Sequence, residues 1–210
     1  MTRTAVTAVT AVTTVMIALA LAGCGKRDTQ DGAGRAVKPA VTIDVAAVNA
    51  LVPAALRDRL VFEQRALVIE RGKHTTTYTV AAPVGWTHDS KLFAHLRSAA
   101  APGAISRLEV GSNCDGECTP KPWQAIADRV NFAPRATARV TKDDRAPGRR
   151  TMITEQGTDG GSAAVVVVTA WWTDGERSYH TCTASLDATL KDAAPAFDKA
   201  CQAVAIDGDD

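Results

Sequence analysis

The sequence lacks the short motifs that mark common catalytic sites. It contains no Gly-x-Ser-x-Gly segment, which presents a serine nucleophile, and no glycine-rich loop followed by Lys-Ser or Lys-Thr, which holds phosphate groups. Its histidines are isolated from one another and from further cysteine pairs, so no four-ligand metal set is apparent: His74, His88, His95 and His180. We therefore predict no catalytic residue, no metal site and no cofactor, and we do not expect an enzyme.

The chain also lacks an excess of charge of either sign. It has 24 Lys and Arg residues against 23 Asp and Glu residues, and one of the basic residues is Arg3 near the N-terminus. Lys142, Arg145, Arg149 and Arg150 are interrupted by acidic residues and a Pro-Gly turn, which predicts the solvated tip of a hairpin. Because nucleic-acid binding needs a concentrated positive surface, we expect no nucleic-acid partner.

Charge is absent as well from the N-terminal segment between Arg3 and Lys26. The run from Thr4 to Ala22 is only moderately apolar and is too short for a confident membrane span. A single basic residue followed by an uncharged run that ends in small residues is typical of an export signal. The run ends in Leu21-Ala22-Gly23-Cys24.

These four residues resemble the cleavage motif of bacterial lipoproteins, in which an aliphatic residue and two small residues precede an invariant cysteine. The resemblance implies cleavage between Gly23 and Cys24 and a lipid anchor, including palmitate, on the Cys24 sulfur. The domain is then expected outside the cytoplasm on a membrane of the bacterial cell envelope, and Gly25 favours the outer membrane. An ordinary secretory signal or an uncleaved anchor is the alternative.

The chain is predicted to have three parts. Residues 1–23 are the lipoprotein signal peptide, and residues 24–40 are the lipidated cysteine and a flexible tether, because this polar composition cannot bury enough apolar surface to order itself. Residues 41–210 are long enough for a single α+β domain with a substantial core.

Four cysteines besides Cys24 are expected to pair in an oxidising compartment. In a strand over residues 178–186, Cys182 lies on the apolar side, and Cys201 shares a helical stripe with Phe197. Both sulfurs should therefore point into the layer between sheet and helix. This predicts a Cys182–Cys201 disulfide and, by remainder, a Cys114–Cys118 disulfide.

The Cys114-Asp-Gly-Glu-Cys118 segment has two other interpretations. Redox thiols are usually separated by two residues at the start of a helix, whereas three residues separate these and Pro120 delays the next helix. A structural zinc site would need further ligands at suitable spacing. The sequence favours a local disulfide over a redox pair or a metal site.

Periodicity predicts the following elements. Helices are expected at residues 48–60, 122–130 and 193–205, with Pro53 tolerated in the first, and residues 89–100 are either a helix or an extended loop. Strands are expected at residues 62–70, 75–82, 105–111, 136–142, 150–155, 163–172 and 178–186. The run 163–172 is apolar on both faces, as a covered central strand should be. Residues 207–210 are predicted to be a solvated end.

This pattern predicts an α+β fold, an antiparallel sheet of about six to seven strands with helices packed on it. The strand ending in Tyr78-Thr-Val-Ala-Ala-Pro-Val-Gly-Trp86, the strand with Tyr179 and Cys182, and the helix with Phe197 and Cys201 resemble the PsbP-like superfamily. The resemblance covers residues 60–206. It implies a PsbP-like sandwich that acts as a binding or assembly accessory without catalytic residues.

Trp171 and Trp172 are adjacent in a predicted strand, so their side chains must face opposite sides of the sheet. An exposed tryptophan here would mark a partner surface, and covering by a helix is the alternative. The leading hypothesis is a non-catalytic envelope lipoprotein that binds another envelope protein or assists its assembly. The alternatives are a thiol oxidoreductase using Cys114 and Cys118, another envelope enzyme, or a carrier of lipid or a small apolar ligand.

Overall fold

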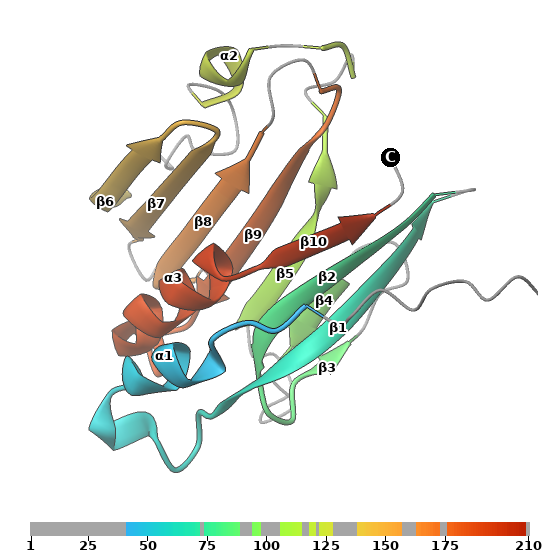
Figure 1. Ribbon diagram of the computed structural model, residues 1–210. Helices are drawn as coiled ribbons and strands as arrows, with labels where there is room; N and C mark the ends of the chain where they lie inside the picture. Colours follow the sequence, from blue (N-terminus) through green and yellow to red (C-terminus); the bar gives the residue numbers. More distant parts are fainter. Residues whose placement is uncertain are drawn as a thin grey trace, which may run out of the picture. The chain divides into compact units, whose positions relative to one another are not determined.

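The computed structural model describes residues 41–71, 74–88, 94–97, 106–114, 118–120, 122–127, 138–156, 163–172 and 176–208. This part of the chain is mostly antiparallel sheet with few helices, as the α+β expectation requires (Figure 1). The strands form two sheets, one of seven strands and one of three. The predictions for the signal peptide and the tether lie outside the described residues.

The seven-stranded sheet has the order β3-β4-β5-β9-β8-β7-β6, and every neighbouring pair is antiparallel. Its strands are β3 (Thr87–His88), β4 (Ala94–Arg97), β5 (Arg107–Asn113), β6 (Arg139–Ala146), β7 (Arg149–Glu155), β8 (Val165–Trp171) and β9 (Tyr179–Leu186). The central strand β8 is buried along most of its length on both faces, which confirms the prediction from its uninterrupted apolar run.

The three-stranded sheet has the order β1-β2-β10. A long hairpin forms most of it, with β1 (Phe62–Arg71) paired to β2 (His74–Pro83) from Phe62–Pro83 to Arg71–His74. The third strand, β10 (Ala205–Gly208), adds to β2 near the end of the described chain. This strand was not predicted: the 193–205 helix was expected to continue through Ala205 and the residues after it to be solvated.

Three α-helices and two 3₁₀ helices complete the described part. They are α1 (Val45–Ala50), η1 (Ala54–Leu56), α2 (Trp123–Ala127), η3 (Lys191–Ala193) and α3 (Ala194–Gln202). The predicted helix at residues 48–60 is wrong in extent, because Pro53 adopts an extended backbone (φ −54°, ψ 141°) and separates α1 from η1. None of the helices in these described segments combines the length and apolar character needed to cross a bilayer.

The structure decides one segment and corrects another. Within residues 89–100, which the sequence left open between a helix and an extended loop, Ala94–Arg97 is a strand, because Leu96 pairs with Leu108 of β5 and is completely buried there. The last helix ends at Gln202, and the chain then turns into β10. In both cases long-range strand pairing decides a backbone conformation that local periodicity left open.

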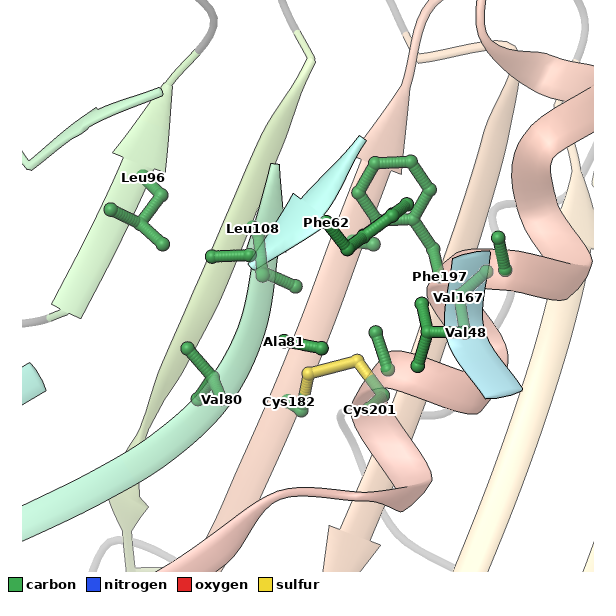
Figure 2. Close-up of a cluster of buried hydrophobic side chains, with 14 of the residues drawn as sticks. Val48, Phe62, Val80, Ala81, Leu96, Leu108, Val167, Cys182, Phe197 and Cys201 are labelled. Carbon is green, nitrogen blue, oxygen red and sulfur yellow. A yellow bond between two sulfur atoms is a disulfide. The ribbon is translucent and has the colours of Figure 1, made fainter. Parts of the chain in front are cut away.

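The main core lies between the seven-stranded sheet on one side and α1, α3 and the small sheet on the other (Figure 2). Helix α3 packs over β8 and β9, and its Phe197 ring is fully buried. That ring meets Phe62 edge to face at 5.0 Å and Trp86 at 5.7 Å between centroids. Phe197 therefore joins the helix, β1 and the end of the β1–β2 hairpin in one cluster.

The opposite face of the seven-stranded sheet carries a smaller cluster. Its buried members are Trp123, Met152, Val168, Ala170, Trp172 and Tyr179. Trp123 comes from α2, so this short helix covers part of that face. The alternation of β8 residues between the two clusters explains why both faces of that strand had to be apolar.

The β6–β7 hairpin is not simply a solvated tip, which corrects the sequence prediction. Arg150 is buried, and its guanidinium donates to both carboxylate oxygens of Asp143, at 2.8 Å and 3.0 Å. Lys142 Nζ reaches Asp198 of α3 at 2.6 Å. The hydrogen bond from Arg150, with the neighbouring Arg145 charge, holds the pKa of Asp143 below its ordinary value despite partial burial.

Asp187, directly after β9, accepts several hydrogen bonds. Ser106 Oγ donates to its carboxylate at 2.8 Å, and the Thr189 hydroxyl and backbone N–H donate at 2.6 Å and 2.8 Å. Burial acts to raise the pKa of Asp187, but these donors to the charged form outweigh it, and the pKa lies below its ordinary value.

We expect Asp187 to contribute stability that is lost in acid. Because its folded-state pKa is lowered, the contribution is complete above the unfolded pKa of about 3.9 and disappears as pH falls through the lower folded value. Asp187→Asn should cost about 1–3 kcal/mol at neutral pH and should lose less stability than the parent on further acidification. Urea unfolding at about pH 6 and about pH 2.5 measures both effects. Parallel losses in parent and variant would contradict this role.

Candidate functional site

A hollow of about 420 Å³ lies where the ends of β8 and β9 meet the segment between α3 and β10. We call it the tryptophan hollow. Its lining residues in the described part of the chain are Gly148, Trp171, Trp172, Glu176, His180, Val204 and Ile206. Four separate stretches of sequence therefore build one concave surface, and both tryptophans singled out from the sequence belong to it.

The two tryptophans occupy opposite sides of the sheet, as their adjacency requires. Trp171 is half-buried and packs against the main core, whereas Trp172 is only 4% exposed and belongs to the smaller cluster. Neither ring is freely exposed, so neither tryptophan projects from the sheet. The Trp171 ring lies on the same face of the sheet as His180, whereas the Trp172 ring is buried in the cluster on the opposite face.

The position of Trp172 is fixed by its neighbours. Its backbone N–H donates to the Gly148 carbonyl at 3.0 Å, and its ring lies 5.6 Å from that of Tyr179. Gly148 has a φ of +68°, and a Cβ at this position would lie 3.0 Å from the Trp172 carbonyl oxygen. The turn and the close approach both require glycine, so the β6–β7 turn and the end of β8 form one rigid wall.

His180 of β9 forms another part of the lining. It stands opposite Trp171 in the β8–β9 register, and its Nδ1 lies 2.9 Å from the Tyr78 hydroxyl of β2. Tyr78 is almost fully buried and stands opposite Ile206 in the β2–β10 register. The hydrogen bond thus joins the two sheets beside the hollow and holds the imidazole in place.

Among the described residues, the lining combines aromatic rings, aliphatic groups and the Glu176 carboxylate. Val204 is partly buried, while Ile206 is 36% exposed and offers an aliphatic surface at the rim. Glu176 is half-buried just before β9. Such a surface can bind an apolar or planar group through the Trp171 indole and orient it through Glu176 and His180.

The two disulfides confirm the predicted pairing. Cys182 of β9 and Cys201 of α3 are both fully buried and bonded, with their Cα atoms 5.3 Å apart (Figure 2). Cys114 and Cys118 are bonded with a Cα separation of 4.9 Å. The first bridge holds α3 on the seven-stranded sheet, and the second follows the end of β5.

The histidines lie on separate elements. His95 approaches the Glu109 carboxylate at 3.2 Å across β4 and β5, His88 is exposed in β3, and His180 lines the hollow. Within the described ranges, no three His, Cys, Asp or Glu side chains gather as metal ligands would.

Sequence reasoning missed most of the hollow. Gly148 was recognised only as part of a turn, and Glu176, Val204 and Ile206 carried no individual signal. Val204 and Ile206 reach the site because β10 returns to pair with β2, and this pairing was not predicted. The adjacent tryptophans were the one usable local signal.

No protein-family model matches the chain, and no curated protein matches it. The chemistry of the site therefore rests on its own residues.

Proposed function

We propose that this chain is a lipid-anchored protein of the bacterial cell envelope that binds another envelope protein and does not catalyse a reaction. The observation that carries the binding role is the tryptophan hollow, a concave surface lined by the half-buried Trp171 together with His180, Val204 and Ile206. Tryptophan is enriched among residues that dominate binding energy, because a large rigid ring loses little conformational entropy on association.

The anchor is proposed from Leu21-Ala22-Gly23-Cys24. Cleavage before Cys24 and acylation of its sulfur would tether the domain to the membrane, with the outer membrane favoured by Gly25. More than one acyl chain holds a protein firmly, since each buried methylene contributes about 0.8 kcal/mol. The segment from residue 24 to 40 would lift the domain, residues 41–210, away from the lipid headgroups.

We further propose that the domain is a PsbP-like sandwich. The antiparallel seven-stranded sheet, the β1–β2 hairpin and the C-terminal helix α3 are consistent with this architecture. Four of the residues that carry the resemblance, Tyr179, Cys182, Phe197 and Cys201, are buried. This proposal favours an accessory role over an enzymatic one.

Cys24→Ser is expected to abolish incorporation of radiolabelled palmitate, because serine has no sulfur to acylate. The parent should be labelled and should sediment with membranes. A Cys114→Ser/Cys118→Ser variant is the matched control, since it also loses thiols but should keep the label. Equal labelling of the parent and the Cys24→Ser variant would contradict the proposed anchor.

The partner site is tested with a photoreactive amino acid placed at Ile206, on the rim of the hollow. Irradiation of intact cells should give a protein adduct, and an added Trp171→Ala change should suppress it. The same amino acid at Val68, which is 49% exposed on β1, is the control and should give no such adduct. Adducts that form equally from both positions, or that persist without the Trp171 ring, would refute the site.

A carrier of a small apolar ligand is the second candidate. The volume of about 420 Å³ and the aliphatic contribution of Val204 and Ile206 favour it, since small-molecule sites commonly enclose roughly 300–1,000 Å³. Native mass spectrometry of the chain purified from membranes distinguishes the two, because a carrier should retain a small mass that denaturation releases.

A further inference from the structure

We propose that the tryptophan hollow receives an arginine side chain presented by the partner protein. This inference rests on the proposed function, because it names the group that the partner places in the hollow. The lining charge, the ring surfaces and the dimensions of the hollow each support it.

The lining carries a negative charge, which favours binding of a cationic side chain. Among the described residues that line the hollow, Glu176 is the one carboxylate, and neither lysine nor arginine is present. Arg149 stands opposite Trp171 in the β7–β8 register, but it does not line the hollow. An anionic group would therefore meet the Glu176 carboxylate, whereas a guanidinium can pair with it.

The Trp171 indole ring favours arginine among the cationic side chains. A guanidinium is planar and more weakly hydrated than an ammonium group, so it stacks on an indole face with a smaller desolvation cost. Such cation–π contacts form most often with arginine and are strongest on tryptophan. The aliphatic stem of the arginine can then pack against Val204 and Ile206 at the rim.

The hollow is also small and held in place. About 420 Å³ accommodates one long side chain. The Trp172–Gly148 hydrogen bond fixes one wall, and the His180–Tyr78 hydrogen bond fixes another. A site that is already formed spends less of its binding free energy on ordering its own side chains.

The test uses the full chain in detergent micelles and two probes, N-acetyl-arginine amide and its uncharged isostere N-acetyl-citrulline amide. Indole N–H resonances, assigned with Trp171→Phe and Trp172→Phe, report binding in the hollow. The arginine probe should shift the Trp171 signal most at millimolar concentration, while the signals of Trp172, in the cluster on the opposite face, and of Trp86, in the main core, stay fixed. Glu176→Gln should weaken the response by about fivefold, whereas Glu63→Gln, an exposed charge on β1, should leave it unchanged.

Equal shifts from the citrulline probe, or an unaltered response in Glu176→Gln, would overturn the assignment of arginine. If neither probe shifts the indoles but the Ile206 photo-adduct forms, the arginine inference fails and the proposed function stands. If the arginine probe binds but no photo-adduct forms, the protein partner is refuted.

Discussion

Replacing Phe197 with alanine is expected to lower the free energy of unfolding by about 4 kcal/mol, because deletion of a buried phenyl ring loses its transfer free energy and leaves a cavity. Phe197 is fully buried, and its ring contacts both Phe62 and Trp86. The hole would open where α3, β1 and the end of the β1–β2 hairpin meet. Phe62 and Trp86 lie on separate segments of the chain, so we expect them to refill the cavity only in part.

Urea or thermal unfolding measures this effect, and for a chain of this size the melting temperature should fall by about 10 °C. Phe197→Leu refills most of the space and should cost much less. Val68→Ala, at an exposed position of β1, is the matched control and should change stability by less than about 0.5 kcal/mol. A Phe197→Ala variant no less stable than Val68→Ala would show that this ring is not central to the core.

Removing the Cys182–Cys201 disulfide by changing both residues to alanine should cost about 3 kcal/mol, because the bridge restricts the unfolded chain across a sequence separation of 19 residues. Alanine is the suitable replacement, since serine would leave two hydroxyl groups in a fully buried site. The variant also loses the covalent link between α3 and β9, so the helix should be the first element to open.

The Cys114–Cys118 pair supplies the comparison. Its ring spans a sequence separation of 4 residues, and the same estimate gives about 2 kcal/mol for its loss. Urea unfolding of the two double variants without reductant should therefore rank them, with the Cys182/Cys201 variant the less stable. Hydrogen exchange should show the larger loss of protection in α3 for that variant alone. The opposite ranking would contradict the structural role assigned to the buried bridge.

The hollow and the stability of the core are coupled through β10. This strand starts directly after the segment that follows α3 and pairs with β2 beside Tyr78. Variants that loosen α3 should therefore disturb Val204 and Ile206 as well as the core. Binding measurements on the tryptophan hollow need variants such as Glu176→Gln, which change the lining without removing buried contacts.

Local sequence pattern predicted the elements whose signal is strong along the chain. The β1–β2 hairpin follows two β-rich runs around a turn, and β8 follows a run that is apolar on both faces. Cys182 and Cys201 were paired correctly, because strand and helix periodicities each place a sulfur on the buried side. Local pattern failed at Pro53, which separates two helices where a single helix was expected. It left β4 undecided, because pairing with β5 sets the backbone conformation around Leu96.

The sequence by itself determined the mainly antiparallel architecture, the disulfide pairing and the two tryptophans at the end of a central strand, because these depend on residue spacing within single elements. Only the tertiary structure decided that Arg150 is buried against Asp143, that residues 205–208 form a strand, and that Glu176, His180 and Ile206 line the same hollow as the tryptophans. The physical reason is that these features arise from pairing between segments far apart in the chain. The free energy of such pairing depends on the side chains and backbone groups of the other segment, which the pattern within one element does not contain.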